Sequence, residues 1–240
     1  MKRITYDLHI HSCLSPCGSD DSTPANIVGM AIVAGLDAIA ITDHNSCLNV
    51  SAAMELGEAY GVTVIPGMEL TTSEEVHVLC YFKELEKAMA FSRYVSENTP
   101  AIQNKPEFFG HQLVVDSDDN VIREENQLLT VASNISFDYV QRILNDYDGL
   151  MVPAHINKAT TSLLSNLGML PENPDFTAVE IQTTDKIPEL TENYPYLQKC
   201  HILTSSDAHY LKDIQDPVHV LHAEENTAES IVDALSCYIQ

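Results

Sequence analysis

Basic residues are scarce in this chain. Its 240 residues include 12 Lys and Arg against 35 Asp and Glu, which gives a formal net charge of −23 at pH 7. A charge of this sign repels polyanions at long range, and no cluster of basic residues is available to bind a phosphate backbone. We therefore expect no large nucleic-acid surface. A small anionic substrate can still bind if metal ions reverse the local potential.

Long apolar runs and paired cysteines are also missing. No run of roughly 18 or more apolar residues occurs, so we expect no membrane span. The N-terminal MKRITYDLHIHS lacks the apolar segment of a signal peptide. The six cysteines show no CxxC spacing, which argues against zinc ribbons and a disulfide scaffold. A reducing, cytoplasmic location is the simplest prediction, and the oligomeric state stays open.

What the chain does contain is an alternation of strand and helix signals, with Gly35 and Gly61 ending the first two helices. The predicted strands lie within residues 4–10, 37–42, 62–67, 75–82, 149–155, 177–182 and 200–209. The predicted helices lie within residues 22–36, 50–60, 84–95, 136–146 and 227–238. This alternation is typical of a parallel α/β sheet or barrel, and it predicts one domain over residues 1–240.

Residues 97–132 interrupt this rhythm. The segment is polar and carries the turn-like DSDDN between two short apolar stretches, QLVVD and DNVIR. These features predict an insertion or lid with a small hairpin.

Histidines and acids gather at the predicted strand ends. In DLHIHS, strict alternation would place Asp7, His9 and His11 on one face of the strand and Leu8 and Ile10 on the other. The C-terminal ends of parallel barrel strands converge on one mouth, so residues distant in sequence should meet there. The residues with this placement are His9, His11, His44, Glu69, His77, His155, Asp207 and His209.

Any one of these residues alone would more often be an ordinary strand or turn residue. Eight of them at successive strand ends favour a shared metal site, because polar side chains are rarely buried unless they are paired or ligated. Imidazole and carboxylate together suit zinc, manganese or iron. Four histidines fall outside the pattern and receive no predicted role: His111, His201, His219 and His222.

Four stretches in this order resemble those of the PHP (polymerase and histidinol phosphatase) family of metal-dependent phosphoesterases. They are DLHIHS, ITDHNS, the Glu69 to His77 pair followed by PAHI, and SSDAHY. The resemblance runs from residue 5 to about residue 212. It implies a distorted (β/α)7 barrel, with the insertion at 97–132, and a cluster of two or three divalent metal ions at its mouth.

The resemblance also implies a division of ligands. His9, His11 and Asp207 resemble ligands of a first metal, and Glu69 resembles the carboxylate that bridges it to a second. His77 and His155 are similar to the other ligands of the second metal, and His44 and His209 to ligands of a third. Cys17, Asp20 and Asp21 are all candidates to complete that third site, while Asp7 and Asp43 are expected to orient ligands from behind.

The implied chemistry is phosphate-ester hydrolysis by metal-activated hydroxide, with His209 as a possible stabiliser of the leaving group. No protein nucleophile is expected, since the sequence has neither a G-x-S-x-G motif nor a P-loop. Lys158 is the candidate for binding a substrate phosphate, against an equally simple role as a solvated loop lysine. Lys212 is a weaker candidate.

The expected substrate is a small phosphate monoester or nucleotide, such as histidinol phosphate, a nucleoside bisphosphate or the end of a very short oligonucleotide. Two alternatives stay open. The same cluster could cleave an amide bond, or the domain could be a catalytically idle, metal-binding regulatory module. The sequence names neither the substrate nor the metal.

Overall fold

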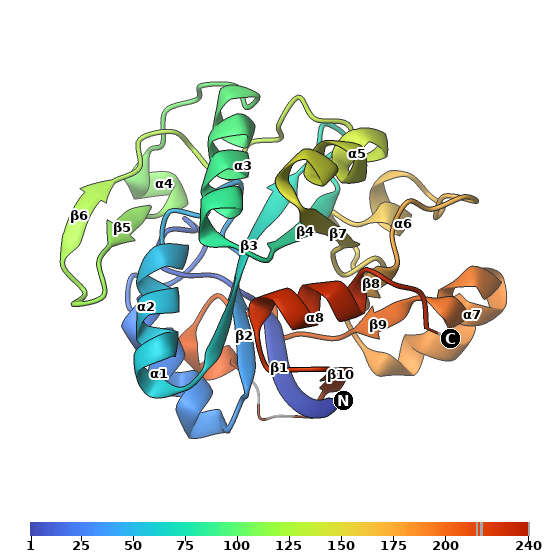
Figure 1. The fold of residues 1–240 in the computed structure, drawn as a ribbon. Helices are drawn as coiled ribbons and strands as arrows, with labels where there is room; N and C mark the ends of the chain where they lie inside the picture. Colours follow the sequence, from blue (N-terminus) through green and yellow to red (C-terminus); the bar gives the residue numbers. More distant parts are fainter. Residues whose placement is uncertain (215, 217, 240) are drawn as a thin grey trace.

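The computed structural model describes residues 1–214, 216 and 218–239 (Figure 1). The strands are β1 (Lys2–Ile10), β2 (Ala38–Ile41), β3 (Thr63–Thr71), β4 (His77–Phe82), β5 (Leu113–Val115), β6 (Val121–Glu124), β7 (Gly149–Pro153), β8 (Ala178–Glu180), β9 (His201–Leu203) and β10 (Val220–Ala223). The α-helices are α1 (Pro24–Ala34), α2 (Val50–Tyr60), α3 (Leu85–Glu97), α4 (Pro106–Phe109), α5 (Val140–Leu144), α6 (Leu163–Asn166), α7 (Ile187–Asn193) and α8 (Ala228–Leu235). Short 3₁₀ turns occupy Phe137–Tyr139, Asn145–Tyr147, Thr184–Lys186, Pro195–Lys199 and Leu211–Asp213. No helix among the described residues is long and apolar enough to cross a membrane.

Six strands form one curled sheet in the order β10-β1-β2-β3-β4-β7. The pairs β1–β2 and β2–β3 are parallel, whereas β4 is antiparallel to both of its neighbours, β3 and β7. The sequence pattern predicted a parallel sheet or barrel, and the antiparallel strand β4 departs from that prediction. Only residues 72–76 join β3 to β4, and so short a link can form a hairpin but not the crossover that a parallel strand requires.

The predicted (β/α)7 barrel is not closed by continuous strand pairing over the described residues. Strands β8 and β9 form a separate parallel pair that is joined to the sheet at two junctions. One junction is made by the Ile156 amide, which donates to the Glu180 carbonyl, and the other by the His11 amide, which donates to the Ala208 carbonyl (both 2.9 Å). The architecture is therefore a half-barrel sheet with a two-stranded segment attached along two seams.

Strand β1 contains an irregularity next to its histidines. Its pairing with β2 shifts register between Asp7 and Ile10, as a β-bulge does. Leu8 packs in the apolar cluster that includes α8, whereas Ile10 packs in the cluster that includes α1. The strict alternation predicted for DLHIHS is therefore wrong at this step, because one extra residue moves the following side chains to the other face.

Helix α8 closes one end of the curled sheet. Its Ile231, Val232 and Leu235 are buried in the same apolar cluster as Leu8. The segment just before α8 is hydrogen-bonded to the first residue of β3, since the Thr63 hydroxyl donates to the Asn226 carbonyl. The opposite end, where β1, β2 and β3 finish, is left for the histidine-rich loops.

The segment 97–132 contains the antiparallel hairpin β5–β6, which the sequence predicted, and the short helix α4, which it did not. It rests on the loop after β1, where the Leu113 amide donates to the Cys13 carbonyl (2.9 Å). Gly110 has φ +99°, and a Cβ there would lie 2.0 Å from the Pro16 carbonyl oxygen, so only glycine permits this close approach.

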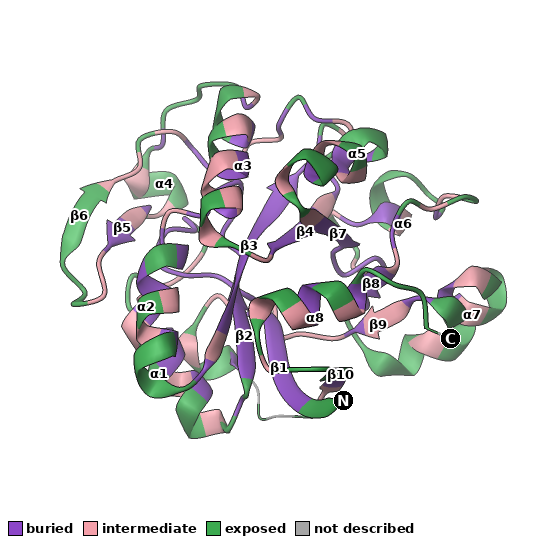
Figure 2. Ribbon diagram, in the orientation of Figure 1, coloured by how far each residue is buried: buried purple, intermediate pink, exposed green. Residues whose placement is uncertain are grey.

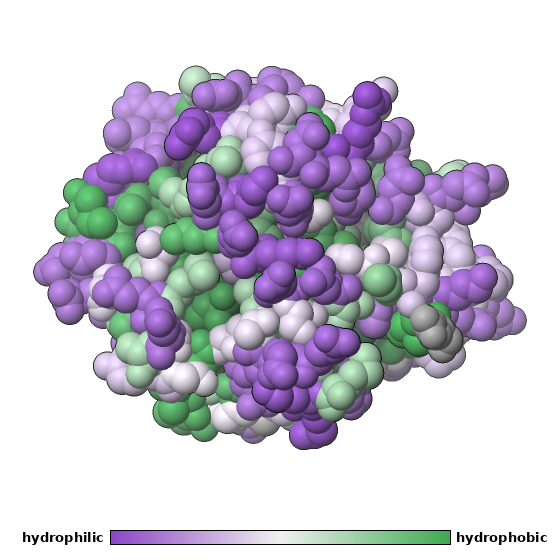
Figure 3. All heavy atoms as spheres, viewed as in Figure 1, coloured by the Kyte–Doolittle hydropathy of each residue, from purple (hydrophilic) through white to green (hydrophobic). Residues whose placement is uncertain are grey.

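In Figure 2 β6 and α4 are largely exposed while the central strands are buried. Figure 3 shows apolar residues at the edge of the molecule that β6 occupies, where Val121 and Ile122 are exposed.

Candidate metal centre

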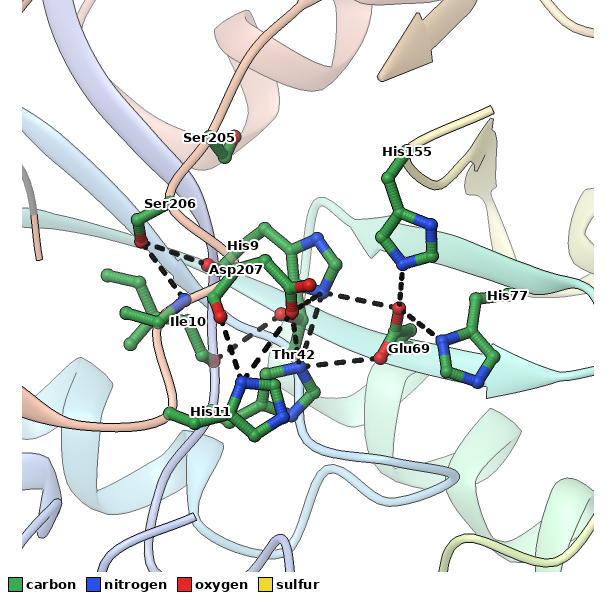
Figure 4. A network of polar contacts seen from close by, with 12 residues as sticks. His9, Ile10, His11, Thr42, Glu69, His77, His155, Ser205, Ser206 and Asp207 are labelled. Atoms are coloured by element: carbon green, nitrogen blue, oxygen red, sulfur yellow. Dashed lines mark hydrogen bonds and ion pairs between the residues drawn. The ribbon is translucent and has the colours of Figure 1, made fainter. Parts of the chain in front are cut away.

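The buried carboxylate of Glu69 lies at the centre of a group of imidazoles (Figure 4). Its Oε1 is 2.8 Å from His77 Nδ1, 3.1 Å from His155 Nε2 and 3.3 Å from His9 Nε2. Its Oε2 is 3.1 Å from His44 Nδ1 and 3.3 Å from His11 Nε2. Five imidazoles from four separate segments of the chain thus surround one carboxylate.

A second carboxylate, Asp207, faces this group from the other side. Its Oδ1 lies 3.4 Å from the Nε2 atoms of both His9 and His11 and 3.7 Å from Nδ1 of His209. The structure therefore brings together all eight residues that the sequence singled out. Ligand atoms close enough to share an ion occur in three groups: His9, His11 and Glu69; His44, Glu69 and His77; and His11, His44 and His209.

The fold explains how these side chains meet. Glu69 lies near the end of β3, and His77 begins β4 directly across from Thr71, so the two lie diagonally across one hairpin. An isolated parallel bridge holds His44 beside Glu69. His77 therefore reaches the mouth from the first residue of an antiparallel strand and not from the end of a parallel one.

The cluster has an uneven charge distribution. Burial alone would raise the pKa of Glu69, but the imidazoles of His77 and His9 outweigh it and hold that pKa well below its usual range. Burial lowers the pKa of His11, yet the nearby carboxylates of Asp207 and Glu69 outweigh it and raise the pKa to about 9. The ionised carboxylates therefore require positive charge beside them, which divalent ions can supply in place of protons.

Two further imidazoles favour the neutral form. Burial lowers the pKa of His77 to about 4, although Glu69 opposes the shift. Burial, aided by His11, lowers the pKa of His209 to about 4 as well. Neutral imidazole is the form that binds metals.

Unpartnered atoms inside the cluster test whether the residues fit a metal. Glu69 Oε2 and His44 Nδ1 are buried 3.1 Å apart, yet neither makes a hydrogen bond. Leaving such atoms unsatisfied costs about 1–3 kcal/mol each. Nitrogen and carboxylate oxygen donors converging at this spacing fit a divalent ion such as zinc, manganese or iron, and the donor types alone do not choose among them.

Two candidate ligands have left-handed backbone conformations. His155 has φ +27° and Asp207 has φ +53°. A non-glycine residue held in a sparsely populated region costs about 1–3 kcal/mol, and such residues cluster at functional sites. Both lie at the seams of the ring, after β7 and β9.

Asp7 and Asp43, predicted to support the ligands, both accept hydrogen bonds behind the cluster. Asp43 accepts from the Ser12 amide (2.7 Å) and from the Ser15 hydroxyl (2.7 Å), and Ser15 in turn contacts His11 Nδ1 (2.9 Å). Asp7 accepts from the Ser206 amide (3.0 Å), next to Asp207. Burial raises the pKa of Asp7, and its Oδ2 has no partner.

Glu180 is a site residue that the sequence reasoning missed. Its carboxylate is 2% exposed, and Oε2 accepts from His9 Nδ1 (2.9 Å) and from the His155 amide (3.0 Å). The available signal was an acid inside the apolar strand TAVEIQ. A buried glutamate of that kind needs a partner, and the partner here is a candidate metal ligand.

The third group has one additional neighbour. Burial and His11 lower the pKa of His44, which belongs to that group, but Cys17 and Glu69 outweigh them and raise it to about 9, whereas Asp20 and Asp21 are exposed on the following turn. Of the three residues considered for this position, Cys17 is the one that acts on the pKa of His44, and Cys17 is itself exposed.

Lys158 reaches the rim of the cluster. Its ammonium group is 2.7 Å from Asp207 Oδ2, whereas His9 and His11 face Oδ1 of the same carboxylate. Burial lowers the pKa of Lys158, but the charge of Asp207 outweighs it and the pKa is raised. Lys212 is exposed and lies over the Tyr210 ring (5.5 Å). The structure thus favours Lys158 over Lys212 as the cation of the mouth.

Comparison with known proteins gives a family match over most of the chain. The model of the PHP domain matches residues 7–184. Among curated proteins, the phosphoribosyl 1,2-cyclic phosphate 1,2-diphosphodiesterase of Eggerthella lenta is 37% identical over 78 residues, which is 30% of this chain and 29% of the relative. This local match leaves most of the relative's length uncompared.

Solved structures share the fold at low identity. The lesion-specific endonuclease PfuEndoQ of Pyrococcus furiosus has a TM-score of 0.70 at 19% identity, over 98% of this chain and 56% of that one. A protein of Bifidobacterium adolescentis assigned to the metal-dependent phosphoesterases has a TM-score of 0.57 at 16% identity, over 94% and 95% of the two chains. This chain thus spans just over half of the endonuclease Q chain and nearly the whole of the second protein.

The prediction that excluded a nucleic-acid surface is contradicted by the endonuclease Q likeness. A structure of endonuclease Q holds a 27-mer duplex with an abasic lesion at the active site, and it matches this chain with a TM-score of 0.68 at 18% identity. Net charge describes the long-range field of a whole chain, whereas bound cations can dominate the local field at a metal site. The acidic composition is therefore no basis for excluding nucleic acid.

Proposed function

Since this chain belongs to the PHP domain family, we propose that it is a metal-dependent phosphoesterase that hydrolyses a small phosphate ester or a nucleotide-type substrate. The observation that carries the proposal is the enclosure of Glu69 by five imidazoles, with Asp207 opposite. Buried ionisable groups of this density are expensive unless they bind cations. The fold shared with a metal-dependent phosphoesterase supports the same reading.

The proposed ligand groups divide around Glu69. His9, His11 and Asp207 would hold one ion and His77 and His155 a second, with Glu69 between them. His44 and His209 would hold a third ion, with Cys17 as the candidate for an additional donor. Bound divalent ions would supply a water of lowered pKa and neutralise charge on the phosphate oxygens.

The remaining chemistry belongs to the chain itself. Nδ1 of His209 lies 2.8 Å from the carbonyl oxygen of Asp207, which can only accept, so this nitrogen carries the proton and Nε2 keeps its lone pair. This arrangement supports a ligand role for His209 more than proton donation to a leaving group. Lys158, at the rim, would bind a phosphate oxygen as a point charge.

A substrate panel tests this proposal. Purified protein supplied with manganese or zinc should release product from p-nitrophenyl phosphate, bis-p-nitrophenyl phosphate or a nucleotide, and the panel should include a duplex with an abasic lesion. His9→Ala should abolish the release. His222→Ala, which alters an exposed histidine of β10, is the matched control and should retain it. Full turnover by His9→Ala at unchanged metal content would refute the assignment.

The two alternatives are outcomes of the same panel. Amide cleavage without phosphate release would identify an amide hydrolase. Two or three bound ions per chain with no turnover on any ester or amide would identify a metal-binding module.

A further inference from the structure

A single carboxylate oxygen connects two of the proposed metal positions. Oε2 of Glu180 accepts from the ring of His9 (2.9 Å) and from the main chain of His155 (3.0 Å). In the proposed function, His9 serves one ion and His155 serves the other. Glu180 itself lies outside every group of side chains close enough to share an ion in the described residues.

The contact with His9 fixes which nitrogen faces the cluster. A metal-ligating imidazole is neutral and keeps one ring proton, and a carboxylate oxygen 2.9 Å from Nδ1 of His9 holds that proton on Nδ1, toward Glu180. The lone pair of Nε2 then points toward Glu69 and Asp207, at 3.3 and 3.4 Å. A carboxylate behind a histidine is a common means of orienting a metal ligand and increasing its basicity.

The contact with His155 fixes a strained backbone. His155 has φ +27°, a conformation that persists only where its surroundings hold it. Glu180 holds this segment twice, since its side chain accepts from the His155 amide and its main-chain carbonyl accepts from the Ile156 amide (2.9 Å). The direction in which the His155 ring leaves the chain therefore depends on Glu180.

We propose that Glu180 is a positioning residue that couples the two metal positions on either side of Glu69, through its hydrogen bonds to the His9 ring and the His155 amide. The proposal rests on the proposed metal centre. It predicts that loss of Glu180 weakens both ions together, whereas loss of a ligand such as His77 weakens mainly its own ion.

The experiment is a metal titration of the metal-stripped full chain with cobalt or zinc, with bound ions counted by elemental analysis. Glu180→Gln keeps the size of the side chain and removes its charge, and it should lower the apparent affinity for both ions by about 10- to 100-fold. Glu180→Asp keeps the charge but shortens the reach, and it should give the same loss even if Glu180→Gln folds poorly. Glu74→Gln is the control, because the side chain of Glu74 accepts from Ser136 and Phe137, neither of which is a candidate ligand.

A spectroscopic readout separates positioning from general stability. In the cobalt-loaded protein, the ring N–H of His9 should give a shifted, slowly exchanging proton signal that Glu180→Asp weakens or removes. Wild-type affinity for both ions in Glu180→Asp, or loss of only one ion, would overturn the coupling. Failure of the proposed function would look different, since the unaltered protein would then bind its ions without hydrolysing any ester.

Discussion

The two sides of the mouth hold their candidate ligands by different means. On one side, Glu69 and His77 belong to strands paired by continuous ladders, and His44 is bridged directly to Glu69. On the other side, Asp207 lies in the segment after the three-residue strand β9, and the next residue, Ala208, forms an isolated bridge with Ile10 of β1. We call these the sheet side and the seam side.

On the seam side, where continuous strand pairing is missing, hydrogen bonds from side chains hold the main chain. Both candidate ligands with left-handed backbones, His155 and Asp207, are on the seam side. Each has a buried carboxylate beside its main chain, since Glu180 accepts from the His155 amide and Asp7 accepts from the Ser206 amide. Side-chain acceptors therefore provide on the seam side the rigidity that strand pairing provides on the sheet side.

The largest effect should follow from altering the residue that both sides share. Glu69→Gln removes the charge that five imidazoles face, so we expect loss of bound metal and turnover at background level. Elemental analysis and phosphate release measure the two effects. Near-normal metal content in Glu69→Gln would show that the two sides do not depend on a common carboxylate.

A smaller effect should follow from loosening the seam side alone. Asp7→Ala removes the acceptor of the Ser206 amide, so the turn that presents Asp207 should lose its fixed conformation. We expect metal affinity to fall by about 10- to 100-fold, as is typical when a supporting group is lost. Asp37→Ala is the matched control. Asp37 also accepts from a main-chain amide, that of Thr5 (2.8 Å), which lies on the same strand as Asp7. Equal losses in both variants would remove the distinction between the sides.

Lys158 tests whether the seam side also binds substrate. Lys158→Ala removes the cation beside Asp207, and a charged hydrogen bond is worth about 1.5–3 kcal/mol. We expect KM for a phosphate ester to rise by about tenfold or more, with metal content unchanged. Steady-state kinetics measure this, with Lys212→Ala as the exposed-lysine control. An unchanged KM would leave Lys158 as a partner of Asp207 only.

The smallest effect on the site should come from disturbing the sheet side at a distance. A Cβ at Gly57 in α2 would lie 2.5 Å from the Val62 carbonyl and 2.6 Å from Val64 Cγ2. Gly57→Ala should therefore lower stability by about 1–3 kcal/mol without changing metal content. Gly29→Ala in α1 meets nothing within 4 Å and should be neutral or mildly stabilising. Thermal unfolding measures the stability of both variants. If Gly57→Ala also lost metal, the strand pairing of the sheet side would not keep the site independent of overall stability.

Much of the site could be predicted because ligand chemistry leaves local marks. A histidine pair at one strand end and acids at others stand out in an apolar sequence, and the alternation of strands and helices places these ends together. The alternation could not give the direction of β4, which depends on the short link between Thr71 and His77. It also could not give the bulge after Asp7, because a register shift appears only when two strands pair.

The supporting residues were harder to predict than the ligands. Glu180 is one acid in an apolar strand, and its value depends on two partners that are 171 and 25 residues away in sequence. Strand β10, which pairs antiparallel with β1, was also missed. Its four residues, VLHA, are too few to show a clear alternation of apolar and polar side chains. Long-range partners of this kind are fixed by how the separate β8–β9 pair and strand β10 meet the rest of the sheet.

The most direct test counts ions and turnover on the same protein. Metal-stripped protein is reloaded stepwise, and phosphate release from p-nitrophenyl phosphate and its bis-ester is measured against the number of ions bound per chain. We predict that turnover is absent without metal, appears as ions fill the group around Glu69, and is lost in His9→Ala. Turnover that does not depend on the number of bound ions, or that persists in His9→Ala, would contradict a metal centre built on Glu69.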